Sequence, residues 1–396
     1  MQAVLFKCPG QEWHWLGGMT LLERNLWLLE AKGVDYALIL HPPDDVLPPL
    51  TALPRRFRLE LFGAHVEVAA ADPLEILPAL RLELRQPFLF LDANLLVDPR
   101  VLETLLWQPP PCFFVVGNGA DHAPAWRVGW LKAENWPLGN QVLRRASRIS
   151  LPAVPLYHVE LQTEVPPYCE RIGDEKDLLR GWQLLIERAT KRPADLIEKY
   201  VTPPLENRLV RELCDTPITP NHLTLLSVAV ALAGASLFYQ GWFFLAVLLA
   251  WIAIVLDGVN GKLARVKLLT SSVGKFEPIL RLFYENAWYL TLAASLARTQ
   301  GAIAWDIGLA IIGCDIGDKV TTTLFAQLKG KTLDEVSPFD QRFRLFSGGR
   351  SLYLLVLLIG FLLGFPLLAF QAVLGWAGVT VLVHLGRVGY HLLLRR

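Results

Sequence analysis

One aspartate, Asp257, ends a long apolar run and opens a segment that is rich in charge. Asn260 follows three residues later, and Lys262 and Arg265 come next. Carboxylate and amide oxygens are hard ligands of the kind that Mg²⁺ prefers, although one of each makes a poor site for two divalent ions. Lys262 and Arg265 could hold a phosphate at the mouth of such a site, or anchor the helix to anionic lipid. The segment therefore places ionic chemistry beside a membrane.

Three charged residues of the next apolar helix share one face of it. Glu277, Arg281 and Glu285 are spaced i, i+4, i+8. Ionisable groups at membrane depth are costly, so they are normally paired or functional. We expect Arg281 to lie between the two glutamates and near Asp257. A plain ion-pair ladder, and a metal site that uses Glu277 or Glu285, remain open as alternatives.

The same segment resembles the signature of the CDP-alcohol phosphatidyltransferase family. That signature reads D-x-x-D-G-x-x-A-R, then eight residues, then G-x-x-x-D-x-x-x-D. The positions that fall on the pattern are Asp257, Gly261, Ala264, Arg265 and Gly274. The residues that replace its second, third and fourth aspartates are Asn260, Pro278 and Leu282. The frame of the motif is kept, and most of its carboxylates are missing.

The resemblance implies a site where four aspartates of two helices meet at the cytoplasmic membrane face. Three would hold Mg²⁺ or Mn²⁺ against the diphosphate of a CDP-alcohol, and the fourth would act as base on the acceptor hydroxyl. Asp257 is then the catalytic candidate, and the metal candidates are Asp257, Asn260, Glu277 and Glu285. The substrate-binding candidates are Gly258, Asn260, Gly261, Lys262, Ala264, Arg265, Gly274, Arg281 and Arg350. The resemblance also implies a homodimer.

Loss of several positions that act as a unit should remove nearly all of the usual activity. We therefore expect a silent or repurposed member that binds a nucleotide or a lipid headgroup, or that partners an active enzyme. Arg281 would stand where a metal ion would have been. An active transferase that uses Asp257 and a rearranged acid set is one alternative, and a membrane scaffold that recruits a cytoplasmic partner is another.

The composition divides the chain in two. The protein has 396 residues, 53% hydrophobic and 19% charged, and long apolar runs begin near residue 221, which is the signature of a membrane domain. The formal net charge of +1 gives no overall field for nucleic acid. The five cysteines are scattered without a C-x-x-C pair, which favours buried thiols over a disulfide frame.

The membrane half contains six predicted spans. They lie at about 221–239, 242–257, 273–297, 302–326, 347–365 and 367–392. Lys and Arg gather in the loops after the second and fourth spans and at the C-terminus, whereas the other loops carry few. By the positive-inside rule we expect a multi-pass protein of the cell (inner) membrane, with the soluble domain and both termini cytoplasmic.

The first half alternates strand-like and helical stretches. Strands are expected at 3–7, 36–40, 65–70, 87–91 and 112–116, and helices at 19–32, 73–82 and 99–107. Such alternation predicts an α/β domain with a mostly parallel sheet. The order resembles GT-A-like nucleotidyltransferases, but the loop CPGQEWHWLGG lacks an Arg for triphosphate. Asp92 stands where that resemblance implies a metal ligand, or is simply a turn residue after a strand.

A proline-rich connection joins the halves, with amphipathic helices expected around 182–189 and 205–213. It is similar to the junction of fused enzymes of di-inositol-phosphate synthesis, which combine inositol-phosphate cytidylyltransferase and phosphate synthase halves. We therefore predict three parts: a nucleotidyltransferase-like α/β domain (1–175), a linker with juxtamembrane helices (176–219) and an all-α six-helix transmembrane domain of CDP-alcohol phosphatidyltransferase type (220–396).

Overall fold

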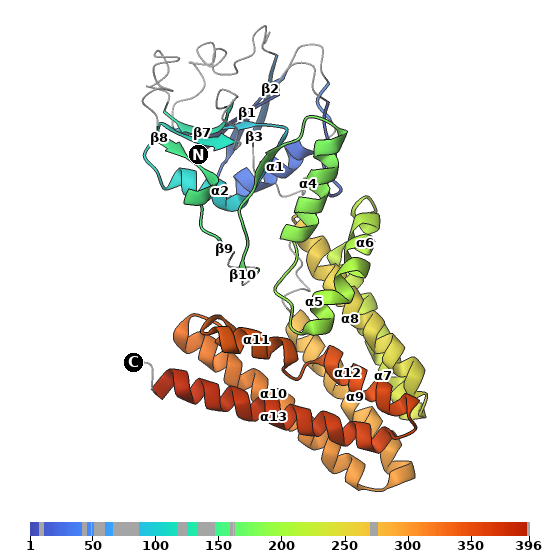
Figure 1. The fold of residues 1–396 in the computed structure, drawn as a ribbon. Helices are drawn as coiled ribbons and strands as arrows, with labels where there is room; N and C mark the ends of the chain where they lie inside the picture. The colour runs from blue at the N-terminus through green and yellow to red at the C-terminus, as the bar shows by residue number, and fades with distance from the viewer. Residues whose placement is uncertain are drawn as a thin grey trace. The chain divides into compact units, whose positions relative to one another are not determined.

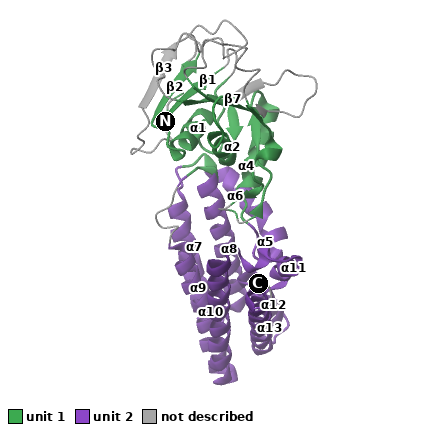
Figure 2. Cartoon of the chain, turned by 90° about the vertical axis from the view of Figure 1, so that its left-hand side faces the viewer, with its two compact units in different colours: residues 1–191, 214–216, 266–268 green, residues 192–213, 217–265, 269–396 purple. Residues whose placement is uncertain are grey.

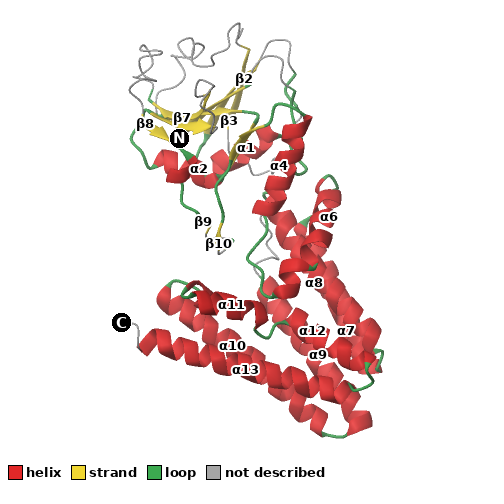
Figure 3. Ribbon diagram, viewed as in Figure 1, coloured by secondary structure: helices red, strands yellow, loops and turns green. Residues whose placement is uncertain are grey.

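The computed structural model describes residues 1–7, 12–41, 46–48, 50, 60–65, 87–116, 125–132, 147–158, 161, 163–269 and 276–393. They form two compact units (Figures 1 and 2). The first is residues 1–191 with 214–216 and 266–268, and the second is residues 192–213, 217–265 and 269–396. Strands belong to the first unit, and the second is helical (Figure 3).

The first unit is built on a mixed seven-stranded sheet in the order β3-β2-β1-β4-β7-β6-β8. Its strands are β1 (Gln2–Phe6), β2 (Tyr36–His41), β3 (Glu60–His65), β4 (Phe88–Asp92), β6 (Cys112–Val116), β7 (Ala125–Leu131) and β8 (Ser147–Ile149). β7 runs antiparallel to both β4 and β6, while the other neighbours are parallel. The prediction of a mostly parallel sheet missed this insertion of β7. β3 ends where the strand predicted at 65–70 begins, and 66–70 and the helix predicted at 73–82 lie outside the described residues.

The described helices of this unit begin at side-chain caps. Thr20 and Glu23 form a capping box at the start of α1 (Leu21–Ala31), and Asp98 caps α2 (Pro99–Leu106). Further on lie α4 (Glu175–Arg188) and two small ladders, formed by β5 (Leu95–Val97) with β11 (Cys169–Arg171) and by β9 (Tyr157–His158) with β10 (Thr163–Glu164).

The second unit is built from helices, as far as the structure describes it. They are α5 (Leu196–Tyr200), α6 (Thr202–Cys214), α7 (Pro220–Gln240), α8 (Phe243–Val266), α9 (Glu277–Gln300), α10 (Ile303–Lys329), α11 (Pro338–Phe346), α12 (Arg350–Leu362) and α13 (Pro366–Leu393). Gly241 takes a left-handed φ of 86° at the end of α7, which lets the chain turn back into α8.

Four described segments are long and apolar enough to cross a membrane: Pro220–Gln240, Phe243–Val266, Pro338–Leu362 and Pro366–Leu393. α9 and α10 are long enough but more polar, and they carry the charged side chains of the site. The predicted count of six spans therefore stays a prediction.

Two helix boundaries differ from the sequence prediction in a way that matters for the site. α8 continues past Asp257 to Val266, because the apolar side chains of Val259, Leu263 and Val266 are fully buried and hold the last turns. Asp257 therefore lies inside a helix and not at its end. α9 begins at Glu277, with Pro278 in its first turn, where the missing N–H of proline costs nothing.

One cluster of buried apolar side chains packs the long helices of the second unit against one another. It contains Phe238 of α7, Ile254 of α8, Trp288 of α9 and Phe370 of α13. The indole N–H of Trp288 donates to the carbonyl oxygen of Ala231 at 2.8 Å, so α9 and α7 are bonded as well as packed. This packing fixes the height and rotation of the helices that carry the site.

Candidate functional site

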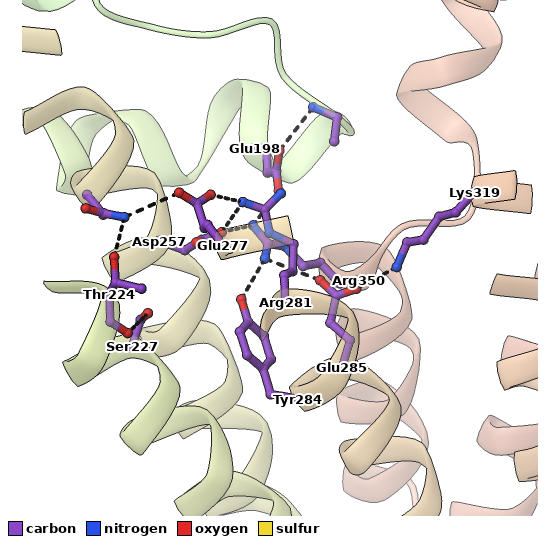
Figure 4. A network of polar contacts seen from close by, with 12 residues as sticks. Glu198, Thr224, Ser227, Asp257, Glu277, Arg281, Tyr284, Glu285, Lys319 and Arg350 are labelled. Carbon is purple, nitrogen blue, oxygen red and sulfur yellow. Dashed lines mark hydrogen bonds and ion pairs between the residues drawn. The ribbon is translucent and has the colours of Figure 1, made fainter. Parts of the chain in front are cut away.

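Asp257 is held by two arginines from other helices. The Oδ2 atom of Asp257 lies 2.8 Å from Nη2 of Arg281 on α9 and 2.8 Å from Nη2 of Arg350 on α12 (Figure 4). Asp257 is only 6% exposed. Three helices, α8, α9 and α12, therefore meet at one carboxylate oxygen. The structure places Arg281 beside Asp257, where the sequence led us to expect it.

Glu277 at the start of α9 bridges Arg281 and Asn260. Its Oε1 atom lies 2.6 Å from Nη2 of Arg281, and its Oε2 atom accepts from Nδ2 of Asn260 at 3.4 Å. The same Nδ2 also donates to Thr224 Oγ1 on α7 at 3.0 Å. Asn260 is thereby tied to α7 and α9 at once (Figure 4).

Glu285 serves two other cations and not Arg281. Its carboxylate lies 3.3 Å from Nη1 of Arg350 and 3.0 Å from Nζ of Lys319. Lys319 also pairs with Asp315 at 2.8 Å, one helical turn away on α10. The expectation that both glutamates flank Arg281 is thus correct for Glu277 and wrong for Glu285, whose side chain points toward α12 and α10.

Arg350 is the centre of this network. Besides Asp257 and Glu285, its guanidinium donates to the hydroxyl oxygen of Tyr284 at 3.1 Å and to Glu198 of α5 at 3.4 Å. The network joins three cations, Arg281, Arg350 and Lys319, to five carboxylates, those of Asp257, Glu277, Glu285, Glu198 and Asp315. Among the described residues of this network the carboxylates outnumber the cations, so we expect an added anion to displace a carboxylate.

A short helix brings Glu198 to the site. Asp195 caps α5 by accepting from the backbone N–H groups of Ile197 and Glu198, both at 2.9 Å. Burial raises the pKa of the Asp195 carboxyl. The sequence shows a helix-start pattern here, an Asp followed three residues later by a Glu, but no spacing rule predicts that Glu198 reaches an arginine far along the chain. Glu198 and Tyr284, which both contact Arg350, are network residues that the sequence did not indicate.

The side chains that could hold Mg²⁺ or Mn²⁺ are already bonded to cations or amides. Asp257 pairs with the guanidinium groups of Arg281 and Arg350. Glu277 contacts Arg281 and Asn260, and Glu285 pairs with Arg350 and Lys319. Among the described residues no His, Cys, Asp and Glu side chains gather in a group of three that could bind a metal. This donor set therefore does not fit a pair of divalent ions.

Lys262 does not face the site, as a substrate-binding residue would. It is 3% exposed and bonds Glu206 and Asn207 of α6, at 2.9 and 2.7 Å. Gly258 lies on the same face, and a Cβ there would come within 2.4 Å of the Glu206 carboxylate. These two residues therefore seat α6 against α8, because the helix period puts them on the side away from Asn260.

The other motif residues are less engaged with Asp257. The guanidinium of Arg265 packs near Gly261, 3.3 Å from where a Cβ would lie, and Ala264 is half-buried. Gly274 lies outside the described residues. The structure thus gathers Asp257, Asn260, Arg281 and Arg350, with Glu277 and Glu285, and leaves Gly258 and Lys262 elsewhere.

Asp92, the candidate of the first unit, is fully buried at the end of β4. It accepts from the backbone N–H of Asn94 at 2.9 Å, and Nε of Arg171 lies 3.8 Å away. This is the geometry of a turn residue with a distant cation beside it, so a metal role for Asp92 stays a prediction.

Comparison with known proteins places the second unit in a family. Residues 217–384 match the model of the CDP-alcohol phosphatidyltransferase family. A 103-residue stretch is 28% identical to a protein of Rubrobacter xylanophilus named bifunctional IPC transferase and DIPP synthase, covering 26% of this chain and 24% of that one. The chain therefore aligns with about a quarter of the length of that relative.

Among solved structures, the chain is similar to phosphatidylinositol phosphate synthase of Mycobacterium tuberculosis. The match to its apo form has 18% sequence identity, spans 47% of this chain and 94% of the enzyme's chain, and has a TM-score of 0.37. The same enzyme was solved with CDP-DAG, at 18% identity, 48% and 94% coverage and a TM-score of 0.37. It was also solved with manganese and citrate, at 17% identity, 48% and 88% coverage and a TM-score of 0.36.

The C-terminal half is a CDP-alcohol phosphatidyltransferase domain, and with its four apolar segments the protein is a membrane protein. The predicted family is confirmed for this half. Within the domain, the position of the motif's first aspartate carries an ion-pair network that ties together α5, α8, α9, α10 and α12.

Proposed function

We propose that the membrane domain no longer transfers a phosphoryl group with the help of metal ions, and instead binds a phosphate-bearing headgroup through Arg281 and Arg350. The observation that carries this proposal is the contact of both guanidinium groups with one oxygen of Asp257. Two cations occupy the neighbourhood in which the family motif would place metal, and the acid set that phosphoryl transfer needs is reduced to one aspartate.

Exchange of ligands on the arginines makes binding possible. A guanidinium group binds carboxylate and phosphate oxygens in the same planar, forked geometry. A phosphate could therefore take the place of Asp257 on Arg281 and Arg350. Because the carboxylates of the network outnumber its cations, we expect exchange of one anion for another and not simple addition. The bound group would be a nucleotide phosphate or the phosphate of a lipid headgroup.

The remaining features of the proposal concern the whole chain. We propose six spans, with the soluble unit and both termini on the cytoplasmic side of the cell membrane, and assembly as a homodimer. The first unit would be a nucleotidyltransferase-like domain, supported by the name of the bifunctional relative. Its Asp92 is engaged in a turn, which favours a binding or partnering role for this unit over catalysis.

The test is thermal stabilisation of the full chain in nanodiscs by CMP, CDP and CDP-diacylglycerol, with and without Mn²⁺. We expect a stabilising shift that does not depend on metal, because the cations that hold the phosphate belong to the protein. Arg281→Ala should abolish the shift. Arg208→Ala is the matched control, because Arg208 lies exposed on α6 in a surface pair with Glu212, and it should leave the shift unchanged.

Two results would favour the alternatives. A shift that requires Mg²⁺ or Mn²⁺, together with release of CMP in the presence of an acceptor alcohol, would indicate an active transferase with a rearranged acid set. The absence of a shift with each of the three ligands would leave a scaffold that recruits a partner.

A further inference from the structure

Buried ion pairs hold one face of α11 against the rest of the second unit (Figure 1). Asp340 is 5% exposed, and its carboxylate lies 2.6 Å from Nε of Arg387 on α13. One turn further along, Arg344 pairs with Asp334 of the preceding 3₁₀ turn (Leu333–Glu335). The rotation of this nine-residue helix about its own axis is therefore fixed.

The opposite face of α11 is aromatic and basic. Phe339 and Phe346 are each 54% exposed, and Arg342 between them is exposed as well. With about 3.6 residues per turn, residues seven apart lie almost above one another, on the side away from Arg344. Helix α11 thus presents two large apolar rings and a cation to its surroundings.

Contacts with neighbouring residues fix the aromatic side of α11. The Phe339 ring stacks on Phe343, with centroids 6.1 Å apart and planes at 9°, and the guanidinium carbon of Arg387 lies 5.1 Å from the centroid of Phe339. The carbonyl oxygen of Phe346 accepts from Nε1 of Trp376 at 3.0 Å. The aromatic side is therefore an ordered part of the protein surface.

Two lysines of the same stretch add to its positive charge. Lys329 ends α10 and Lys331 follows it, and both are exposed. Within the part of the chain that the structure describes, neither lysine nor Arg342 is in an ion pair. The stretch 329–346 therefore has three cations whose counter-charge comes from solvent or from another molecule.

The acidic residues of this stretch are engaged with the protein. Asp334 and Asp340 are at most 9% exposed and lie in the ion pairs given above. Glu335 accepts from the backbone N–H of Thr332 at 2.9 Å. The outward charge of the stretch is thus mainly positive, which fits an anionic partner.

We infer that α11 lies on the bilayer surface and that its aromatic and basic face binds the headgroups of anionic phospholipids. Helix α11 connects α10 and α12 within a membrane domain, so a bilayer is the partner at hand. Nine residues extend about 14 Å, less than half of the hydrocarbon core, so α11 does not cross it alone. Rings at the acyl boundary with cations at the level of the phosphates are typical of helices that lie in the interface. The residues of this surface take no part in the network at Asp257.

The experiment measures amide hydrogen exchange of the full chain in nanodiscs of phosphatidylcholine, alone or mixed with phosphatidylglycerol. A lipid that binds only folded α11 slows the exchange of its amides. One cation near an anionic surface contributes about 1 kcal/mol, or about fivefold. We expect residues 338–346 to exchange about tenfold more slowly with phosphatidylglycerol, since Arg342 contributes in full and the two lysines in part. Salt at about 1 M, where the screening length is about 3 Å, should remove most of the difference. Residues 175–188 of α4 serve as the internal control and should exchange equally in both discs.

Arg342→Gln should lose about fivefold of the lipid-dependent slowing, and Lys329→Gln with Lys331→Gln added to it should lose the rest. These side chains are exposed and have no ion pair among the described residues, so the variants should fold. Lys176→Gln, at an exposed cation of α4, is the matched control and should keep the full effect. Equal exchange of α11 in both kinds of disc would overturn the inference, because neutral lipid, a second copy of the chain or a protein partner would then cover the face. An effect of phosphatidylglycerol that survives in the triple variant would also overturn it.

Discussion

Asp257→Asn is expected to raise the affinity of the membrane domain for a phosphate-bearing ligand by about tenfold. In the structure the Asp257 carboxylate occupies both guanidinium groups that would bind phosphate. The neutral amide competes less well for these guanidinium groups. A hydrogen bond to a charged group contributes about 1.5–3 kcal/mol, and a change of about 1.4 kcal/mol in binding free energy corresponds to a tenfold change in affinity. Titration of CMP or of a polyol phosphate into the full chain, without metal, measures the change.

The same substitution has a cost in stability. Removal of one charge from a buried ion pair typically lowers the free energy of unfolding by about 3–5 kcal/mol. We expect a smaller loss, because Arg350 keeps Glu285 and the Arg281 side chain is 36% exposed. If Asp257→Asn binds the phosphate-bearing ligand more tightly and also melts at a lower temperature, the Asp257 carboxylate competes with the ligand for the two arginines. A metal ligand would give the opposite sign, with affinity lost on substitution.

Arg350→Met is expected to be the most destabilising single change in the network. Its guanidinium is the contact shared by Asp257, Glu285 and Glu198, and its side chain is only 12% exposed. Loss of the cation leaves three carboxylates facing one another with less compensation, which should cost about 3–5 kcal/mol in the free energy of unfolding. Thermal and denaturant unfolding in nanodiscs measure the loss, and ligand binding should fall as well.

Two companion variants make this result specific. Arg350→Lys keeps the charge but loses the fork that reaches several carboxylates, so it should lie between the unaltered protein and Arg350→Met. Arg208→Met removes an exposed arginine from an i, i+4 surface pair and should change stability by less than about 1 kcal/mol. If Arg350→Met were no more destabilising than Arg208→Met, the network would not hold the helices together.

The predictable part of this molecule is the part that depends on local sequence. Apolar runs predicted the long helices of the second unit, and the strand–helix alternation predicted β1, β2, β4 and β6 within a residue or two. The i, i+4 spacing predicted the pair of Arg281 with Glu277. Each of these features follows from residues that are neighbours on one helix or strand.

The parts that escaped prediction depend on contacts between distant segments. Glu198 and Arg350 are far apart in sequence and meet because Asp195, the N-cap of α5, lies beside the start of α12. Lys262 was assigned to the site from its place in a motif, but the helix period puts it on the other face of α8, where it pairs with Glu206 of α6. No strand was predicted at Ala125–Leu131, and periodicity would not have given the antiparallel direction of β7 either.

In the proposed function, the protein's own cations, and not metal ions, neutralise the carboxylate of Asp257. The most direct measurement is a titration of Mn²⁺ into the full chain in nanodiscs, followed by the electron paramagnetic resonance signal of free Mn²⁺. We predict that the unaltered protein and Asp257→Asn give the same curve, with no saturable binding that depends on Asp257. One or two equivalents of Mn²⁺ bound by the unaltered protein and lost in Asp257→Asn would contradict it and would restore a metal-dependent transferase as the function of this domain.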